Sequence, residues 1–197
     1  MSLMRWLFIA LIALGAWQHW HARPVMALPG RIAPADPTQT SPAKRAIYRV
    51  GNYELQPLAD FAIEARVLGK EVYHADRESD LAPVDLALGW GAMSDSAVLD
   101  KLSISQSGRF YAYRWSEAPP LPPQEIVSHS ANMHLVPASA TIEKQIKAVR
   151  PGQVVRIRGQ LIEATAPDGW RWRSSLTRED SGAGACELVR VDEISVR

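Results

Sequence analysis

The stretch SATIEKQIKAVRPGQVVRIRGQLIEATAPDGWRWR (residues 139–173) decides the fold, because it places a helix, a strand and a hairpin turn in succession. Ser139 has the side chain of a helix N-cap, and apolar residues follow it at spacings of four and three, the period of an amphipathic helix. That apolar face consists of Ile142, Ile146 and Val149. We predict that the helix ends at 150–152, where proline and glycine interrupt the pattern.

A strand and a hairpin are predicted directly after this helix. Apolar residues alternate with polar ones over residues 155–161, which is the period of two of a half-buried strand. Asp168 and Gly169 predict a hairpin turn, because both central residues of such a turn favour positive φ. Beyond the turn, Trp170 and Trp172 alternate with arginines and are expected to point toward the core.

The remaining patterns extend this plan over residues 46–197. Alternation or an aromatic-rich composition predicts strands at 47–58, 60–73, 109–115, 133–136 and 186–196. A helical turn is predicted at 85–89, and a helix capped by Ser94 or Asp95 is predicted as far as Leu102. We therefore predict an α+β domain, mostly antiparallel β, built as a small OB-like barrel or a sandwich with two or three short helices.

The composition is that of a globular protein held together by packing. Of its 197 residues, 47% are hydrophobic and 22% are charged, so extensive disorder is not expected. The formal net charge of +1 argues against binding to a polyanion through bulk charge. Cys186 is the only cysteine, so no disulfide can form within the chain.

The N-terminus predicts a membrane anchor. Residues 1–20 carry one basic residue, Arg5, and continue as an apolar run that tryptophans bracket as in an aromatic belt. A signal peptide has a similar start, but its small-residue cleavage site is poor here, since residues 25–27 lie well past the apolar run. We therefore favour an uncleaved anchor over a signal peptide, with the N-terminus inside and the domain outside.

Residues 21–45 are predicted to form a linker. Proline and glycine are frequent in this segment, at Pro24, Pro29, Gly30, Pro34, Pro37 and Pro42. This composition favours an extended, semi-rigid spacer over a packed element. The β-rich extracytoplasmic domain is expected to begin near Ala46.

Three blocks of sequence carry a resemblance: DLALGWGAMSD (85–95), HSANMHLVPA (129–138) and SSLTREDSGAGACE (174–187). They resemble an uncharacterised family of bacterial membrane-anchored proteins. The resemblance covers most of the chain from Asp60 onward and includes the anchor. It implies an anchor followed by an extracytoplasmic domain, and it implies no activity.

Histidine and cysteine give the first candidate site, because imidazole and thiolate bind zinc or copper. His129 and His134 lie five residues apart, with His74 and Cys186 elsewhere in the chain. The spacing fits neither an HExxH nor a paired CxxC template, and it places the two side chains on opposite faces of a strand. A metal site would need a turn at residues 131–132. Otherwise these imidazoles make hydrogen bonds in a loop, and no cofactor is expected.

Cys186 gives a second candidate site as a nucleophile. Together with His129 or His134 and with Asn132, it supplies the residue types of a Cys-His-Asn site. The glycines at 182 and 184 provide flexible backbone amides that could face an oxyanion. The same residues are also typical of a plain loop that enters a strand around a small buried cysteine.

Arginines give a third candidate site. Two of them lie on the strand before the Asp168–Gly169 turn and two lie after it, so we expect four guanidinium groups on one face of the hairpin. These predicted binding residues are Arg156, Arg158, Arg171 and Arg173. They fit an anionic partner such as phospholipid headgroups, an acidic protein surface or a cell-wall polymer, and nucleic acid is not expected. A solvated sheet face explains the same pattern.

Trp90, flanked by Gly89 and Gly91, is the last candidate for binding. Glycines beside a tryptophan allow an exposed corner at a ligand or protein interface. They equally allow a tight turn that buries the ring.

The leading hypothesis is a membrane-tethered, non-enzymatic binding or assembly module that contacts another envelope protein or an anionic surface. The predicted location is a bacterial inner membrane, crossed once, with the domain in the periplasm. The alternative is a hydrolase or metal-binding protein that uses His129, His134 and Cys186.

Overall fold

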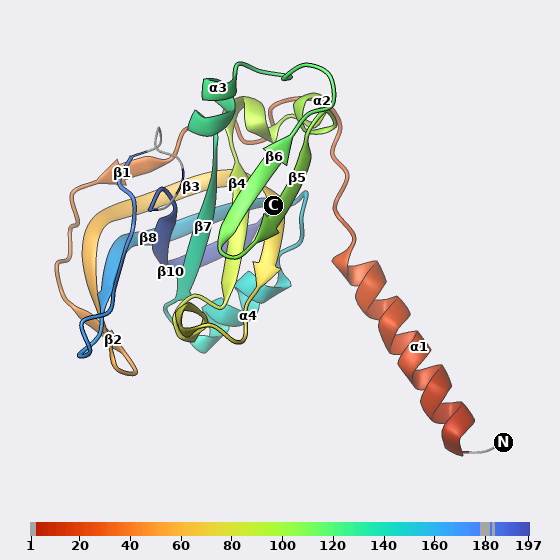
Figure 1. The fold of residues 1–197 in the computed structure, drawn as a ribbon, viewed down its shortest axis with the longest axis horizontal. Coiled ribbons are helices and arrows are strands. Elements are labelled where there is room, and N and C mark those ends of the chain that lie inside the picture. Colours follow the sequence, from red (N-terminus) through yellow and green to blue (C-terminus); the bar gives the residue numbers. More distant parts are fainter. Residues whose placement is uncertain (1–2, 178–181, 183) are drawn as a thin grey trace.

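The computed structural model describes residues 3–177, 182 and 184–197. Figure 1 shows a β domain from which one long helix projects. The strands are β1 (Thr38–Thr40), β2 (Tyr48–Val50), β3 (Tyr53–Val72), β4 (Val84–Gly89), β5 (Ser103–Ser107), β6 (Phe110–Arg114), β7 (Ser130–Pro137), β8 (Val154–Thr165), β9 (Arg171–Arg173) and β10 (Glu187–Val196). The helices are α1 (Leu3–Ala22), α2 (Ser96–Leu99), α3 (Pro123–Ser128) and α4 (Ala140–Ala148), with 3-10 turns η1 (Arg77–Asp80) and η2 (Gly91–Ser94).

Five strands close into a ring. Hydrogen-bonded neighbours follow the order β3, β4, β7, β10 and β8, and β8 pairs in turn with β3. Every pair in the ring is antiparallel except β7 with β10, which is parallel. The prediction of an α+β domain with a mainly antiparallel sheet is therefore confirmed. Ring closure also pairs both edges of each of these strands, which removes exposed edges.

The main hydrophobic core fills this ring. One cluster of buried apolar residues draws on all five ring strands and on Ile146 of α4. A second cluster uses the alternate face of β8: Leu161 belongs to the first cluster, whereas Ile162 and Ala164 belong to the second. Trp170 and Trp172 pack against this second cluster, so the prediction that they point to apolar surroundings is confirmed.

Gly159 lies where β8 touches both of its neighbours. It is opposite Phe61 on β3 and opposite Val191 on β10. A Cβ atom at this position would lie 1.9 Å from the carbonyl oxygen of Arg190, far inside van der Waals contact. The close approach of β8 and β10 therefore requires glycine here.

The helix and strand that open the deciding stretch are confirmed. α4 begins after Ser139, whose side chain accepts a hydrogen bond from the backbone N–H of Ile142, and it ends before Val149. β8 follows at Val154–Thr165 and turns through residues 167–169 into β9, which pairs antiparallel with it. Gly169 has φ of 88°, in the left-handed region, as predicted. Asp168 does not have positive φ, because residues 166–170 form a longer connection than the two-residue turn that was expected.

Residues 85–89 form a strand, so the prediction of a helical turn there is wrong. All six residues of β4 are buried, because the ring core covers one face and a second layer covers the other. A strand buried on both faces loses its alternating pattern and looks like a short apolar helix. The helix predicted as far as Leu102 is also shorter: α2 ends at Leu99, with Asp95 as its N-cap.

A hairpin of β5 and β6 lies over the ring, and β5 was not predicted. Figure 1 shows the two strands crossing in front of β4, with their turn beside β7. They pair antiparallel with each other around a two-residue turn, Gly108 and Arg109. Both turn residues have positive φ, of 56° and 71°, as a tight turn between twisted strands needs.

The segment between α1 and the domain is extended and lies against the domain. Val25 N–H donates to the Pro151 carbonyl at 2.8 Å, and the Ala27 carbonyl accepts from the Ser96 hydroxyl at 2.8 Å. Ala33 is buried, and β1 pairs with β3. These contacts differ from the free spacer that the proline content suggested, since an extended backbone offers unpaired N–H and C=O groups that the domain satisfies.

Helix α1 projects away from the domain as a mainly apolar helix. Its side chains from Met4 to Ala16 are exposed, among them Phe8, Leu11 and Leu14. Among the described residues, no helix combines the length and the mean hydropathy that define a candidate membrane span.

Replacing Gly159 with alanine tests ring closure. We expect G159A to lower the free energy of unfolding by about 1–3 kcal/mol, the usual cost of overpacking, because the new Cβ meets the Arg190 carbonyl. Urea denaturation measures the change. Arg158→Ala is the control, since this exposed neighbour on β8 should alter stability by no more than about 0.5 kcal/mol. Equal stability of G159A and the unmodified protein would contradict the close approach.

Candidate functional site

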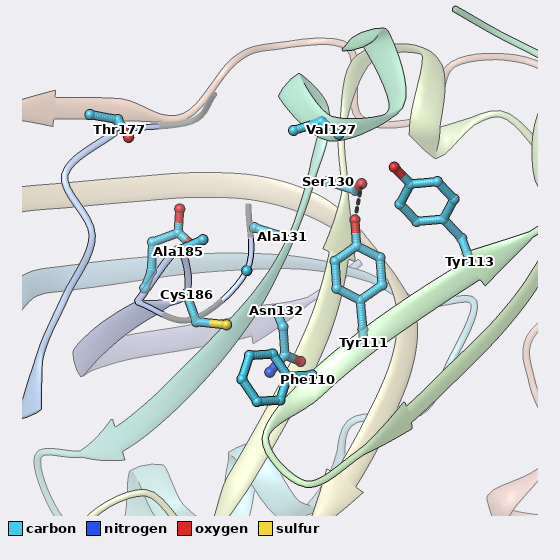
Figure 2. A pocket seen from close by; sticks show the side chains of 12 residues that line it. Phe110, Tyr111, Tyr113, Val127, Ser130, Ala131, Asn132, Thr177, Ala185 and Cys186 are labelled. Carbon is cyan, nitrogen blue, oxygen red and sulfur yellow. Dashed lines mark hydrogen bonds between the residues drawn. The ribbon is translucent and has the colours of Figure 1, made fainter. Parts of the chain in front are cut away.

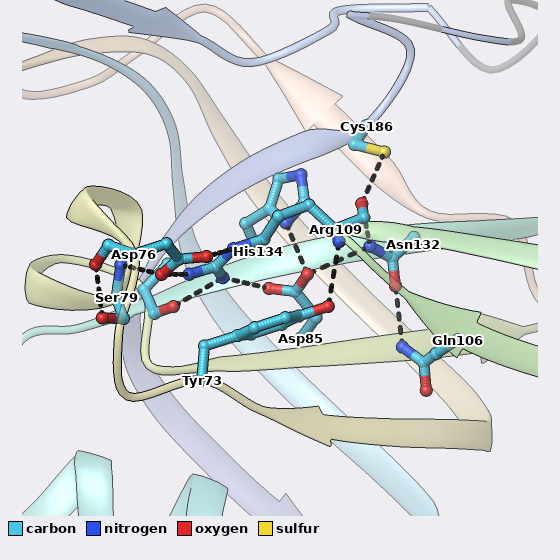
Figure 3. Close-up of polar contacts among 10 residues, drawn as sticks. Tyr73, Asp76, Ser79, Asp85, Gln106, Arg109, Asn132, His134 and Cys186 are labelled. Carbon is cyan, nitrogen blue, oxygen red and sulfur yellow. Dashed lines mark hydrogen bonds and ion pairs between the residues drawn. The ribbon is translucent and has the colours of Figure 1, made fainter.

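A buried carboxylate organises the outer face of β4 and β7. Asp85 on β4 is completely buried, and its direct neighbour across the sheet is His134 on β7. Arg109 Nη1 donates to one carboxylate oxygen at 2.9 Å, and Asn132 Nδ2 donates to the other at 3.3 Å. Figure 3 shows these side chains converging from β4, β7 and the tip of the β5–β6 hairpin. A charge taken out of water needs such partners.

Arg109 joins this carboxylate to a second one at the surface. Its Nε and Nη2 donate to the two oxygens of Asp76, at 3.0 and 2.7 Å. Its guanidinium carbon lies 3.7 Å from the centre of the Tyr73 ring, and its backbone N–H donates to the Tyr73 hydroxyl at 3.0 Å. The hairpin tip is therefore held by ion pairs, a cation–π contact and main-chain hydrogen bonds together.

These contacts shift the ionisation of the partners. The hydrogen bonds from Arg109 lower the pKa of Asp76 below its ordinary value of 3.8, against the effect of burial. Burial alone lowers the pKa of Arg109, but the hydrogen bonds and charges of Asp76 and Asp85 raise it overall. Burial raises the pKa of the Tyr73 hydroxyl. The lowered pKa of Asp76 and the raised pKa of Arg109 keep this ion pair charged at neutral pH, so that it clamps the hairpin tip.

His134 completes the network from β7. Its Nδ1 lies 2.9 Å from the Asp85 carboxylate, although the ring N–H is not aligned on the oxygen as in a good hydrogen bond. The ring packs against Trp172, with centroids 4.8 Å apart. This histidine is buried, so its contacts serve the interior of the protein rather than its surface.

A pocket of about 150 Å³ lies beside this network, between the hairpin and the start of β10. Figure 2 shows aromatic side chains of β6 on one side and Cys186 on the other. Its main lining residues are Phe110, Tyr111, Tyr113, Ser130, Asn132 and Cys186. A space of this size accepts one ring or one amino-acid side chain, because an apolar cavity of similar volume holds a benzene molecule.

Some of the polar groups that line the pocket are already hydrogen-bonded within the protein. The hydroxyls of Tyr111 and Ser130 lie 2.5 Å apart, and Ser130 donates to the carbonyl of Ile126 at 2.7 Å. Burial raises the pKa of Tyr111 to about 12, so its hydroxyl stays neutral. Because Ser130 donates its proton to Ile126, the Tyr111 hydroxyl is the donor in its hydrogen bond to Ser130. Aromatic walls with a few fixed polar groups are typical of a binding pocket.

The structure buries Trp90 instead of exposing it. The ring is 1% exposed and belongs to the main core, next to the 3-10 turn η2. Gly91 has φ of 51°, and an added Cβ would lie 2.5 Å from the His129 ring. The interpretation of these glycines as a tight turn that buries the tryptophan is therefore correct, and the exposed binding corner is wrong.

The four predicted arginines separate into two pairs. Arg156 and Arg158 lie near the start of β8, whereas Arg171 and Arg173 lie on β9 opposite its far half. Arg156 is opposite Glu64 and Arg173 is opposite Glu163, seven residues further along β8, or about 23 Å. The expected single face of four guanidinium groups is therefore not formed.

Carboxylates pair with three of these arginines. Glu64 accepts from Arg156, and Glu163 pairs with both Arg171 and Arg173, which lower the pKa of that carboxyl. Arg158 is exposed beside a shallow surface groove that also contains Lys44 and Arg190. Binding of an anion by these arginines stays a prediction. Carboxylates already neutralise the charges of Arg156, Arg171 and Arg173.

The two predicted metal ligands face different partners. His129 follows α3, and its Nδ1 lies 2.9 Å from the Glu125 carbonyl, whereas His134 meets Asp85. Five residues of extended chain separate them by about 16 Å. Within residues 3–177, 182 and 184–197, no group of three or more His, Cys, Asp or Glu side chains is placed to hold a metal ion. Zinc or copper binding at these histidines stays a prediction without a preformed site.

Cys186 and Asn132 do come together. Both approach the carbonyl oxygen of Arg109, the amide nitrogen of Asn132 at 2.9 Å and the sulfur of Cys186 at 3.8 Å. Asn132 also accepts a hydrogen bond from Gln106, so its amide has two partners on the hairpin. The side chain of Asn132 is thus used to hold the hairpin. The nucleophile hypothesis stays a prediction, and part of the 174–187 block on which it drew lies outside the described residues.

Arg109, Asp85 and the tyrosines of β6 are site residues that sequence reasoning missed. Asp85 is a lone carboxylate within the apolar run VDLALG, which by itself indicates a buried charge with a partner. Gly108 and Arg109 stand between two five-residue segments of strand composition, which is the length of a hairpin turn. No pattern in the sequence joins Arg109 to Asp85.

Family models, curated proteins and solved structures provide no match to this chain. The resemblance to bacterial membrane-anchored proteins therefore stays a prediction.

Removing the guanidinium of Arg109 tests the clamp. We expect Arg109→Met to lower the free energy of unfolding by about 3–5 kcal/mol, because it leaves the buried Asp85 charge without its cation. Urea denaturation measures the loss. Arg114→Met on the same hairpin is the matched control, and its exposed side chain should contribute about 0.5 kcal/mol or less. Similar losses in the two variants would show that Arg109 does not neutralise Asp85.

Acidification should weaken the same clamp. The pKa of Asp76 is lowered in the folded protein, so its contribution to stability is present above its ordinary value of 3.8 and is lost as the pH falls through the lower folded value. We expect the unfolding free energy to decrease below pH 3.8, and Asp76→Asn to make this decrease shallower. Thermal unfolding across that range provides the measurement. An unchanged pH dependence in the asparagine variant would count against the ion pair.

Proposed function

We propose that this protein is a membrane-tethered, non-enzymatic binding module whose β domain contacts another envelope protein. One observation carries the proposal: α1 projects from the domain, and its apolar side chains between Met4 and Ala16 are exposed. A helix that is apolar on all sides is stable when it is buried in lipid or in protein. Its 20 residues give a length of about 30 Å, close to the thickness of the hydrocarbon core of a bilayer.

The order of the ring strands supports an OB-type barrel. Along the chain, β3, β4 and β7 form an antiparallel meander, α4 follows, and β8 and β10 complete the ring with β10 parallel to β7. OB-type barrels are five-stranded Greek-key barrels, and they bind ligands on the face of their second and third strands. Here those strands are β4 and β7, and residues 130–132 of β7 line the pocket.

The chemistry of the pocket supports a protein partner. Phe110 is 49% exposed at its rim, and Tyr113 stacks with Trp115 at a centroid distance of 6.2 Å along the same hairpin. Aromatic side chains are enriched at the centres of protein interfaces, and a pocket for one side chain is typical of an interface anchor. A location of the domain in the periplasm agrees with the arrangement of an N-terminal anchor followed by a single domain.

Photo-crosslinking in membranes tests both parts of the proposal. A benzophenone amino acid in place of Phe110 should crosslink a partner protein in alkali-washed native membranes, and the same probe at Val196 should not. Val196 is the matched control, because its exposure of 47% is similar and it lies at the far end of β10. Tyr113→Ala should reduce crosslinking from position 110 at least about threefold, since loss of an interface aromatic costs more than about 1 kcal/mol.

Two outcomes would contradict the proposal separately. Recovery of the chain in the alkali supernatant would exclude insertion of α1 into lipid. Equal crosslinking from positions 110 and 196, unaffected by Tyr113→Ala, would show that the pocket is not where a partner binds.

A further inference from the structure

We propose that the basic end of α4, defined as Lys144, Lys147 and Arg150, binds anionic phospholipid headgroups beside the point where α1 leaves the domain. This inference rests on the proposed tether and names a second partner for the domain. It follows from how closely the linker is fastened to the loop after α4.

The linker fixes α4 near the end of α1. Only Arg23 and Pro24 separate Ala22, the last residue of α1, from Val25, whose N–H bonds to the Pro151 carbonyl. Three residue steps span at most about 11 Å, so Pro151 is held within a short distance of the helix end. An added Cβ at Gly152 would lie 1.9 Å from the Val25 carbonyl, which shows that linker and loop are in direct contact.

The exposed side of this linker is apolar. Val25 and Ala27 are partly buried against the domain, whereas Met26 and Leu28 point outward and are 86% and 85% exposed. Apolar side chains that alternate with docked residues next to an anchor are well placed to enter the interfacial layer of a bilayer. They indicate that this side of the domain faces lipid.

The charge of α4 complements such a surface. Lys144 and Lys147 are exposed and lie one turn apart, and Arg150 follows at the C-terminal end of the helix. Glu143 is the acidic residue of this helix, and Lys147 pairs with it at 2.5 Å. Lys70 reinforces the positive end, because its Nζ donates to the carbonyls of Lys147 and Val149 at 3.0 and 2.7 Å. Figure 1 shows α4 on the lower side of the domain, toward which α1 extends.

Anionic lipid explains these features together. Basic clusters close to a membrane segment bind negatively charged headgroups, and the attraction falls off within a Debye length of about 8 Å at physiological salt. The linker fastens the loop directly after α4 within three residue steps of the end of α1, so the basic end of α4 is held close to the proposed anchor. With the basic end of α4 on the headgroups, the domain would be held in one orientation over the bilayer.

Energy transfer between the domain and labelled lipid tests the inference. The full chain carries a donor dye at Gln145→Cys, with Cys186→Ser to leave one thiol, and is reconstituted in vesicles that contain a headgroup-labelled acceptor lipid. The vesicles consist of phosphatidylcholine, with or without phosphatidylglycerol at about a quarter of the lipid. We expect transfer from position 145 to increase at least about twofold with phosphatidylglycerol, and to return to the lower value in about 0.5 M salt.

Charge variants test whether headgroup binding depends on the basic end of α4 or on basic residues elsewhere. Replacement of Lys144, Lys147 and Arg150 by glutamine should abolish the dependence on phosphatidylglycerol. The double variant Lys101→Gln/Arg114→Gln removes two exposed charges on and beside the hairpin. It should leave the dependence of energy transfer on phosphatidylglycerol unchanged. Urea denaturation should give stabilities within about 1 kcal/mol of each other for the two sets, since Arg150 is half-buried, the other side chains are exposed, and the exposed Lys147–Glu143 pair contributes little.

The outcomes distinguish this inference from the proposed function. Equal transfer in both lipids, with the chain still bound to vesicles, would overturn headgroup binding and leave the tether intact. Failure of the chain to float with vesicles of either composition would overturn the tether and this inference together. Energy transfer could instead increase only when membrane proteins are added, with or without phosphatidylglycerol. That result would overturn the assignment to lipid and would favour an acidic protein surface as the partner.

Discussion

Neutralisation of the Asp85 carboxylate is the interaction on which the outer layer of this protein depends. Asp85 is buried in a strand of the ring, where an isolated charge is very unfavourable. Arg109 pairs with it from the tip of the β5–β6 hairpin, which lies over the ring, and Asn132 and His134 complete the contacts from the neighbouring strand β7. The position of the hairpin over the ring follows from this requirement, because its tip must reach the carboxylate.

The candidate binding pocket is a consequence of the same clamp. Once Arg109 is fixed, β6 lies across β7, and its aromatic side chains form a wall opposite the start of β10. The polar groups near the wall are occupied in holding the hairpin, as the Asn132 amide shows with its bonds to Gln106 and to the Arg109 carbonyl. Aromatic side chains beside a small pocket are the features on which the proposed recognition of a protein side chain rests.

The linker connects this domain to its proposed place on a membrane. Segments rich in proline often act as spacers, yet here hydrogen bonds to Pro151 and Ser96 fasten the linker within a few residues of α1. A domain fastened so closely has little freedom to turn away from the bilayer that would hold α1. The basic end of α4 and the outward-facing Met26 and Leu28 would then meet the same lipid surface. The aromatic pocket lies elsewhere, between the β5–β6 hairpin, β7 and the start of β10.

The sequence by itself determined α4, β8, the turn after β8 and the mostly antiparallel character of the domain, because their periodicity, capping and turn residues act over short distances. The sequence could not assign β4, because burial on both faces removed the alternating pattern of a strand. It could not decide whether Trp90 is exposed or buried either, because the flanking glycines permit both arrangements. The candidate site was largely hidden, since Arg109 and Asp85 meet across 24 residues and the β6 tyrosines line a pocket formed only by the crossing of distant strands. Such contacts depend on how the ring closes, and ring closure is decided by pairings between β3 and β8 that are about a hundred residues apart in the chain.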